Sequence, residues 1–200
     1  MTEGKPKQTR KGNRERLMMA ALGLMEQDQS GLSGISLRQI TKACGLSPPA
    51  FYSHFASVEE LGLALVEDVG ESLREVLKAV RDAETKEAVI AQSVAAAFSY
   101  IRANEALFVL ITRERAGNSA RLRAAIRCEV RRTVEEVANN FYQLSLFSRF
   151  NLEEMHAVVA AIVALGLNLI PDLLDLSRQS KELGDALLAE YEYQIRLMLF

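Results

Sequence analysis

The chain has 200 residues, 49% of them hydrophobic and 25% charged, enough to bury a sizeable core in one domain or two small ones. It holds two cysteines, far apart in sequence, and two histidines, and no Cys/His cluster has the spacing of metal ligands. The composition therefore excludes a zinc-type centre and a disulfide scaffold, and each cysteine is expected to be a free, buried thiol.

No targeting or membrane segment is apparent in the sequence. The basic start is not followed by an apolar h-region with a small-residue cleavage site. The longest apolar run, Ala157–Leu167, is shorter than the roughly 20 residues that span a bilayer. A cytoplasmic protein without a membrane partner is expected.

The net charge of −2 conceals an asymmetry along the chain. Residues 1–57 hold eight Lys and Arg against four Asp and Glu, whereas the remaining residues hold 16 against 22. A basic end on an acidic body is typical of a DNA-binding domain attached to something else. Residues 1–12, rich in Lys and Arg, are predicted to be a flexible arm that contacts DNA phosphates or the minor groove; a solubilising tail is the alternative.

Three helices are predicted after this arm. The first spans about 13–28, with an inward stripe made of Leu17, Ala21, Leu22 and Met25. Ser36 then forms a capping box with Gln39 and opens a second helix. Gly45 supplies the positive φ of a tight turn, and Ser47 caps a third helix that has Pro48 at its first position.

The third helix, over 47–54, has the character of a DNA-recognition helix. Phe51 and Phe55 are four residues apart and are predicted to point inward, which leaves their polar neighbours facing out. A short helix with few acids and many hydrogen-bonding groups suits the major groove. An α-hairpin without a partner is the alternative. The candidate DNA contacts are Ser36, Arg38, Lys42, Ser47, Pro48, Pro49, Ala50, Tyr52, Ser53 and His54.

The segment SLRQITKACGLSPPAFYSHFASVEELGLALV resembles the DNA-binding domain of the TetR family of bacterial repressors, over roughly residues 13–66. Its part FYSHFASVEEL is similar to the family pattern Tyr-x-His/Tyr-Phe-x-x-Lys-x-x-Leu, with Val58 where many members carry a phosphate-binding Lys. A backbone N–H at the start of the helix from Ser57 could bind that phosphate instead. The resemblance implies an all-α fold, with an N-terminal three-helix helix-turn-helix head (13–57) joined to a six-helix ligand-binding and dimerisation body (58–200).

Periodicity likewise predicts helices throughout the body, about nine in the whole chain. The expected body helices span about 57–82, 86–103, 104–114, 119–145, 151–170 and 181–199. Pro171 is expected to kink or end the fifth of these.

The helix over 151–170 is apolar on too many sides for a surface helix, and its small residues permit close approach of another helix. A homodimer formed through this helix and the last one is predicted, as the TetR resemblance also implies; a central core helix is the alternative. The candidate interface residues are Val158, Ile162, Leu165, Leu169, Leu187, Tyr191 and Ile195.

A narrower resemblance concerns the body. FVLITRERAGNSARLRAAI (108–126) and VEELGLALVEDVGESLR (58–74, Val58 included) are similar to the FabR/DesT branch, whose members repress unsaturated fatty-acid synthesis and sense acyl thioesters of coenzyme A or acyl carrier protein. This implies an apolar tunnel for an acyl chain and basic groups for the carrier's phosphates. The candidate ligand contacts are Phe98, Ile101, Phe108, Ile111, Arg113, Arg115, Phe141 and Leu144; plain core packing and surface salt bridges are the alternatives.

No GxSxG, P-loop or GxGxxG motif occurs, so an enzyme is not expected, and no cofactor is implied beyond an acyl-thioester effector. The predicted function is a dimeric repressor that binds a palindromic operator and controls fatty-acid biosynthesis genes in response to long-chain acyl thioesters. The alternative is a TetR-type repressor of a transporter or catabolic operon that senses another hydrophobic small molecule. An adaptor that binds only protein would leave the basic head unexplained.

Overall fold

The computed structural model describes residues 7–28, 31–80, 85–144 and 147–200, and within them it is all-α, as predicted. The head contains α1 (Lys7–Asp28), a 3-10 turn η1 (Leu32–Gly34), α2 (Leu37–Ala43) and α3 (Pro48–Tyr52). The body contains α4 (Val58–Lys78), α5 (Lys86–Ala103), α6 (Glu105–Glu114), α7 (Ala120–Gln143), α8 (Leu152–Gln179) and α9 (Lys181–Leu199).

Side-chain caps explain where most of these helices begin. Ser36 and Asn151 each form a full capping box, with Gln39 and Glu154 respectively. Further hydroxyl groups accept the backbone N–H three residues on: those of Ser47, Ser57, Thr85, Ser119 and Ser180. Because such caps are local, most of the helix starts agree with the sequence prediction to within a residue or two.

Two predicted boundaries need correction. α1 begins at Lys7, six residues before its predicted start, so half of the predicted arm is helical and residues 1–6 lie outside the described part of the chain. α8 does not end at Pro171 but continues to Gln179. Buried Ile170, Leu173 and Leu174 pack on both sides of the proline and favour continuation of the helix despite the missing N–H.

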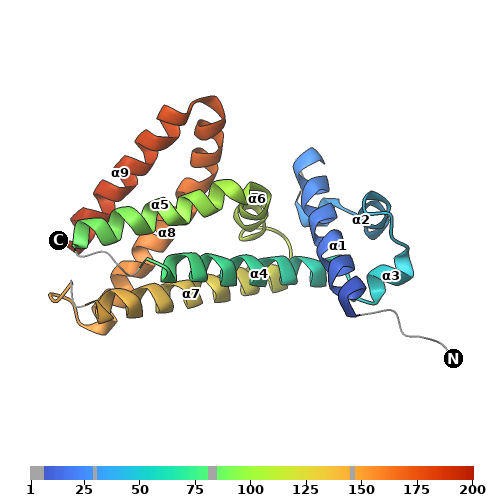
Figure 1. Cartoon of the computed structure of the whole chain (residues 1–200), viewed down its shortest axis with the longest axis horizontal. Coiled ribbons are helices and arrows are strands. Elements are labelled where there is room, and N and C mark those ends of the chain that lie inside the picture. The colour runs from blue at the N-terminus through green and yellow to red at the C-terminus, as the bar shows by residue number, and fades with distance from the viewer. Residues whose placement is uncertain (1–6, 29–30, 81–84, 145–146) are drawn as a thin grey trace.

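The head lies at the N-terminal end of α4, and the body is built around the rest of this helix (Figure 1). α4 runs from the head along the length of the body beside α7, its most extensive partner. α8 packs on α7 and α9, and α5 packs on α4 and α9. The head meets the body where α1 packs on α6 and η1 packs on α4. A displacement of α4 or α6 is therefore felt directly by the head.

α8 is more apolar than its burial within the chain explains. Its most apolar 18-residue window has a mean hydropathy of 2.2, and only 28% of that window is buried inside the chain. By length and composition alone α8 meets the requirement of a membrane span, as does the pair α5 and α6 if this pair, bent by 94°, is counted as one span. Core helices of soluble proteins meet the same requirement, so composition does not identify what covers the outer face of α8.

Candidate functional site

The turn between α2 and α3 fixes the geometry of the head. Gly45 has φ of 64°, a conformation that a side chain disfavours, and the N–H of Leu46 closes the turn by donating to the carbonyl of Thr41 at 2.9 Å. Ile40 of α2 and Phe51 of α3 are fully buried beside each other's helices. The turn and this small core hold α3 across α2, which is the helix-turn-helix arrangement that the sequence predicted.

The outer side of α3 is available to a partner. Tyr52 is 61% exposed, and its ring stands edge-on to buried Phe51 at 5.8 Å. The Ser53 hydroxyl donates to the Ala50 carbonyl at 2.7 Å. Of the other predicted contacts on this helix, Ser47, Pro48 and Pro49 are exposed, whereas Ala50 and His54 are half-buried. The inward placement of Phe51 and Phe55 is as predicted.

α2 contributes a basic, exposed edge. Arg38 and Lys42, four residues apart, are both exposed and lie on the same side of the helix. The Ser36 hydroxyl instead donates to Gln39 Oε1 at 2.7 Å, and Ser47 Oγ accepts the Ala50 N–H at 3.4 Å. Ser36 and Ser47 therefore serve first as helix caps, a role that leaves them at the N-terminal ends where phosphate is favoured.

Two further basic residues hold the head together. The Arg16 guanidinium donates to the carbonyl of Cys44 at 2.5 Å, at the C-terminal end of α2. Arg14 pairs with Asp68 of α4 at 3.3 Å and lies over the Phe55 ring. Part of the positive charge counted in residues 1–57 is thus used to position α1 against α2 and α4.

Comparison with known proteins identifies this head. The family of bacterial regulatory proteins known as the tetR family matches residues 18–65, from α1 into α4. The head is similar to the DNA-binding domain of that family. The match supports a transcriptional regulator rather than an enzyme, as the sequence predicted.

Solved structures share the TetR-type fold over the whole chain. FadR of Bacillus halodurans, a fatty-acid degradation regulator, superposes with a TM-score of 0.75 at 14% identity, over 98% of this chain and 97% of that one. The TetR-family regulator PfmR of Thermus thermophilus gives 0.67 at 18%, over 93% and 95%. FadR of Bacillus subtilis in complex with stearoyl-CoA gives 0.66 at 12%, over 92% and 97%. At these identities the likeness establishes the fold.

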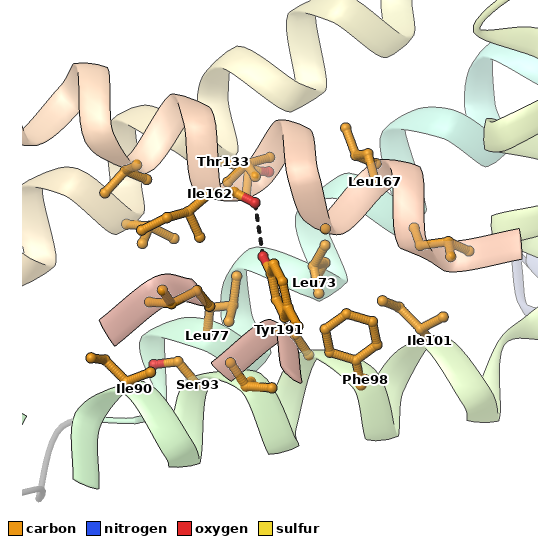
Figure 2. A pocket seen from close by; sticks show the side chains of 18 of the residues that line it. Leu73, Leu77, Ile90, Ser93, Phe98, Ile101, Thr133, Ile162, Leu167 and Tyr191 are labelled. Carbon is orange, nitrogen blue, oxygen red and sulfur yellow. Dashed lines mark hydrogen bonds between the residues drawn. The ribbon is translucent and has the colours of Figure 1, made fainter. Parts of the chain in front are cut away.

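The TetR-type body encloses an apolar cavity of about 130 Å³ (Figure 2). All six body helices contribute to its wall, and none of the residues that line it is charged. A second cavity of about 60 Å³ adjoins it, and Leu73, Phe108, Thr133, Val163 and Leu167 line both. The residues that line both cavities come from α4, α6, α7 and α8.

Tyr191 of α9 stands across the larger cavity (Figure 2). Its hydroxyl donates to the Ile162 carbonyl of α8 at 2.8 Å, and its ring meets the Phe98 ring edge-on at 5.5 Å. Burial raises the pKa of the Tyr191 phenol, because the charged form is disfavoured away from water. The hydroxyl groups of Ser93 and Thr133 also lie in the wall, and Thr133 Oγ1 donates to the Glu129 carbonyl at 3.0 Å.

The structure brings most of the predicted apolar ligand contacts together. Phe98, Ile101, Phe108 and Phe141 line the larger cavity, and Ile111 lines the smaller. Leu144 is half-buried at the end of α7 and lines neither.

The two arginines predicted to bind phosphate lie elsewhere. Arg113 lines a separate groove between α1, α6 and α8, and exposed Arg115 donates to Asn168 Oδ1 at 3.3 Å. Neither arginine lines the cavity that Phe108 and Ile111 help to form, and the role predicted for them, contact with the phosphates of a thioester carrier, stays a prediction.

Sequence reasoning overlooked much of the cavity wall. Leu73 and Leu77 of α4, Ser93 of α5 and Thr133 of α7 line it, along with Tyr191. The leucines stand at helical spacing among the other apolar residues of α4, and nothing in a single sequence distinguishes a core position from a cavity position. Ser93 and Thr133, polar residues among apolar neighbours at helical spacing, were the available signal.

The predicted dimer residues fall into two groups. Val158, Leu165, Leu169 and Leu187 are half-buried and retain surface for a partner. Ile162 lines the cavity, and Tyr191 and Ile195 are buried inside the chain at 6% and 4% exposure, so these two have almost no surface to offer a second subunit. Ile162, Tyr191 and Ile195 form part of the cavity wall.

The exposed outer faces of α8 and α9 consist of other residues. On α9, Leu183, Tyr193 and Leu197 are 45%, 61% and 65% exposed, at spacings that place them on one side of the helix. On α8, Ala157, Ala161 and Ala164 are exposed along one side. We call these six residues the outer apolar face.

Proposed function

We propose that the chain is a ligand-responsive transcriptional regulator that binds a palindromic operator as a homodimer. The observation that carries this proposal is the outer side of α3, where Tyr52 is 61% exposed while Phe51 beneath it is fully buried. A large aromatic side chain with a polar end, on a helix that packs against α2 with its exposed Arg38 and Lys42, suits a groove lined by base edges and phosphates. The N-terminal end of α3 enters the major groove in this arrangement.

The homodimer forms through the outer apolar face. Alanines along α8 allow another helix to approach closely, and Leu183, Tyr193 and Leu197 of α9 supply the large side chains that bury most area. A two-fold dimer of this kind presents two heads to one face of DNA, and their half-sites lie about 34–36 Å apart. A palindromic operator follows from that symmetry.

Selection of bound duplexes from a random pool tests DNA binding and symmetry together. We expect the pool to converge on an inverted repeat whose half-sites are one helical turn apart or a multiple of it. Convergence on a single, non-repeated element would contradict the dimeric mode. Failure of the pool to converge, with binding that depends only on salt, would contradict sequence-specific regulation altogether.

The effector is a fatty-acyl thioester whose chain enters the body cavity, and the regulated genes belong to fatty-acid metabolism. The apolar wall contributed by six helices supports this, as do the fold neighbours, one a fatty-acid degradation regulator and one bound to stearoyl-CoA. In the FabR/DesT-like version of the proposal the chain represses fatty-acid biosynthesis. α4 contributes Leu73 and Leu77 to the cavity wall and is joined to the head. It therefore carries the effect of ligand binding from the cavity to the head.

The size of the cavity favours a second candidate. An apolar cavity of about 150 Å³ holds a molecule the size of benzene, and the cavity here measures about 130 Å³. No arginine lines it to receive the phosphates of a carrier. A small apolar effector of a transporter or catabolic operon therefore fits the cavity as it stands, whereas a long acyl chain requires Tyr191 to move.

DNA affinity measured with acyl-CoAs of increasing chain length, and with small apolar molecules, separates the two candidates. The acyl proposal expects an effect that grows with chain length until the cavity is filled. An effect confined to small apolar molecules would select the second candidate. A ligand that raises DNA affinity acts as a corepressor, and one that lowers DNA affinity acts as an inducer. Coupling on the order of 1–3 kcal/mol is typical of such regulators.

A further inference from the structure

A buried acid joins the head to the body. Glu114, the last residue of α6, is only 4% exposed. Its Oε1 accepts the backbone N–H of Leu32 at 2.8 Å, a buried hydrogen bond between residues 82 positions apart. Leu32 opens the 3-10 turn η1, which leads from α1 into α2 and so helps to orient the helix-turn-helix. This bond is a direct polar link from α6 to the DNA-binding head.

The space around this carboxyl group depends on two glycines. A Cβ at Gly31 would lie 2.8 Å from Glu114 Oε1, and a Cβ at Gly117 would approach Oε2 too closely as well. Gly31 belongs to the head and Gly117 to the turn after α6. Two segments distant in sequence thus lack side chains where they enclose the same carboxyl group, which indicates a close-fitting contact rather than an incidental one.

The same helix reaches the ligand cavity. Phe108, Ile111 and Glu114 follow one another at three-residue spacing on α6, and all three are buried. Phe108 lines both cavities and Ile111 lines the smaller one. Since α6 has only ten residues, a shift at Phe108 displaces Glu114 within the same short helix.

We propose that Glu114 is the positioning residue that fixes the DNA-binding head on the body, and that α6 makes this fixation depend on the packing of the cavity. The proposal rests on the proposed function as a DNA-binding dimer, but not on the identity of the effector. Without its acceptor the Leu32 N–H would be a buried, unsatisfied donor. The head would then shift away from α6 so that this N–H could reach water. Head orientation decides whether two half-sites are contacted at once.

Three variants separate positioning from general stability. Glu114→Gln keeps an oxygen acceptor for Leu32, whereas Glu114→Ala removes it. Arg121→Gln is the matched control, because Arg121 ties α7 to Glu59 and Glu60 of α4 near the same joint without touching Leu32. We expect amide exchange at Leu32 to rise roughly tenfold or more in Glu114→Ala and to stay near wild type in Glu114→Gln and Arg121→Gln.

DNA affinity is measured on two duplexes: the palindrome selected by the wild-type protein, and a duplex with one of its half-sites. Glu114→Ala should lose affinity for the palindrome by about tenfold while its affinity for the half-site stays unchanged, because each head remains folded but its placement is no longer fixed. Glu114→Gln should restore palindrome affinity. Equal loss on both duplexes, no loss on either, or failure of Glu114→Gln to restore binding overturns the proposal.

The link to the cavity is tested without any ligand. Phe108→Ala removes cavity wall on α6, and Phe141→Ala removes cavity wall on α7 as its control. Faster exchange at Leu32 is expected in Phe108→Ala and not in Phe141→Ala. If both variants change Leu32 exchange alike, or neither does, α6 does not carry the link. An absence of any acyl-CoA effect would refute the acyl proposal and leave this result standing.

Discussion

Two tyrosines, Tyr52 of the head and Tyr191 of the body, occupy opposite environments. Tyr52 projects from a helix whose inner side is fully buried, so its position is rigid while its ring is free to contact a partner. Tyr191 projects inward, and its hydroxyl finds one partner, the carbonyl of Ile162, in otherwise apolar surroundings. A buried hydroxyl without that partner would cost free energy, which is why Tyr191 adopts this position across the cavity.

Replacing Tyr52 by alanine should weaken operator binding by about 1–3 kcal/mol, the scale of one good groove contact. Tyr142→Ala is the control, because Tyr142 is also exposed, at 48%, but lies near the end of α7 in the body. Binding is measured on the selected palindrome, and circular dichroism checks that the head remains folded. Equal affinities for the two variants would contradict the assigned orientation of α3.

Replacing Tyr191 by phenylalanine should lower the free energy of unfolding by about 1 kcal/mol at neutral pH, through loss of the hydrogen bond to Ile162. Burial raises the Tyr191 pKa in the folded state, so the wild type retains a proton that the unfolded chain releases above about pH 10. Its contribution is thus present below that pH and lost as pH rises. Denaturant titrations should show wild type and Tyr191→Phe converging in alkali; a constant difference would contradict the assignment.

At the scale of elements, α4 and α7 form the axis that connects the cavity with the head. Arg74 of α4 and Glu129 of α7 pair at 2.5 Å with side chains only 10% and 12% exposed, and Arg74 also reaches Glu136 at 3.2 Å. The pair fixes the register of the two helices, because a buried charge that loses its partner is strongly disfavoured. These ion pairs link α4 to α7 within the body.

Arg74→Ala should destabilise the fold by about 2 kcal/mol, the scale of a hydrogen bond to a charged group, since Glu129 keeps Arg132 as a second partner at 2.7 Å. Lys78→Ala is its control on the same helix, since Lys78 and Glu75 pair at 3.8 Å in the exposed last turn, where such pairs contribute about 0.5 kcal/mol or less. Chemical unfolding measures both. A similar small effect of the two substitutions would show that the Arg74 pair does not hold α4 and α7 in register.

At the scale of the whole molecule, the chain leaves apolar surface where a second subunit would sit. α8 is as hydrophobic as a membrane span, yet only 28% of its most apolar window is buried. The outer apolar face continues this surface onto α9. The head lies at the N-terminal end of α4 (Figure 1), so the proposed assembly at α8 and α9 would leave both heads open to DNA.

If the proposed dimer forms through the outer apolar face, Leu197→Arg should convert it to a monomer, because a charge within an apolar interface is left desolvated and unpaired. Met19→Arg is the control, as Met19 is equally exposed, at 67%, but lies on α1 of the head. Light scattering and sedimentation at several concentrations give the oligomeric state. A Leu197→Arg protein that remains dimeric would place the interface elsewhere.

The sequence by itself determined the elements of this protein, and the tertiary structure decided what its apolar residues do. Caps such as Ser36 and Ser47, the turn at Gly45 and the pair Phe51 and Phe55 are local signals, and the head they predict is the head observed. Tyr191 and Ile195 were predicted to face a partner and instead face the cavity. Helical periodicity shows which side of a helix is apolar. It does not show whether that side faces an internal cavity or a second subunit.

Contacts between distant segments were beyond the reach of sequence patterns. Arg113 and Arg115 were expected to contact the phosphates of a carrier, and the structure places them outside the cavity wall. Nothing near Glu114 in sequence indicates that its carboxyl group accepts the N–H of Leu32. Such pairings depend on the angle at which helices cross, which is set by the packing of the whole core and not by any one segment.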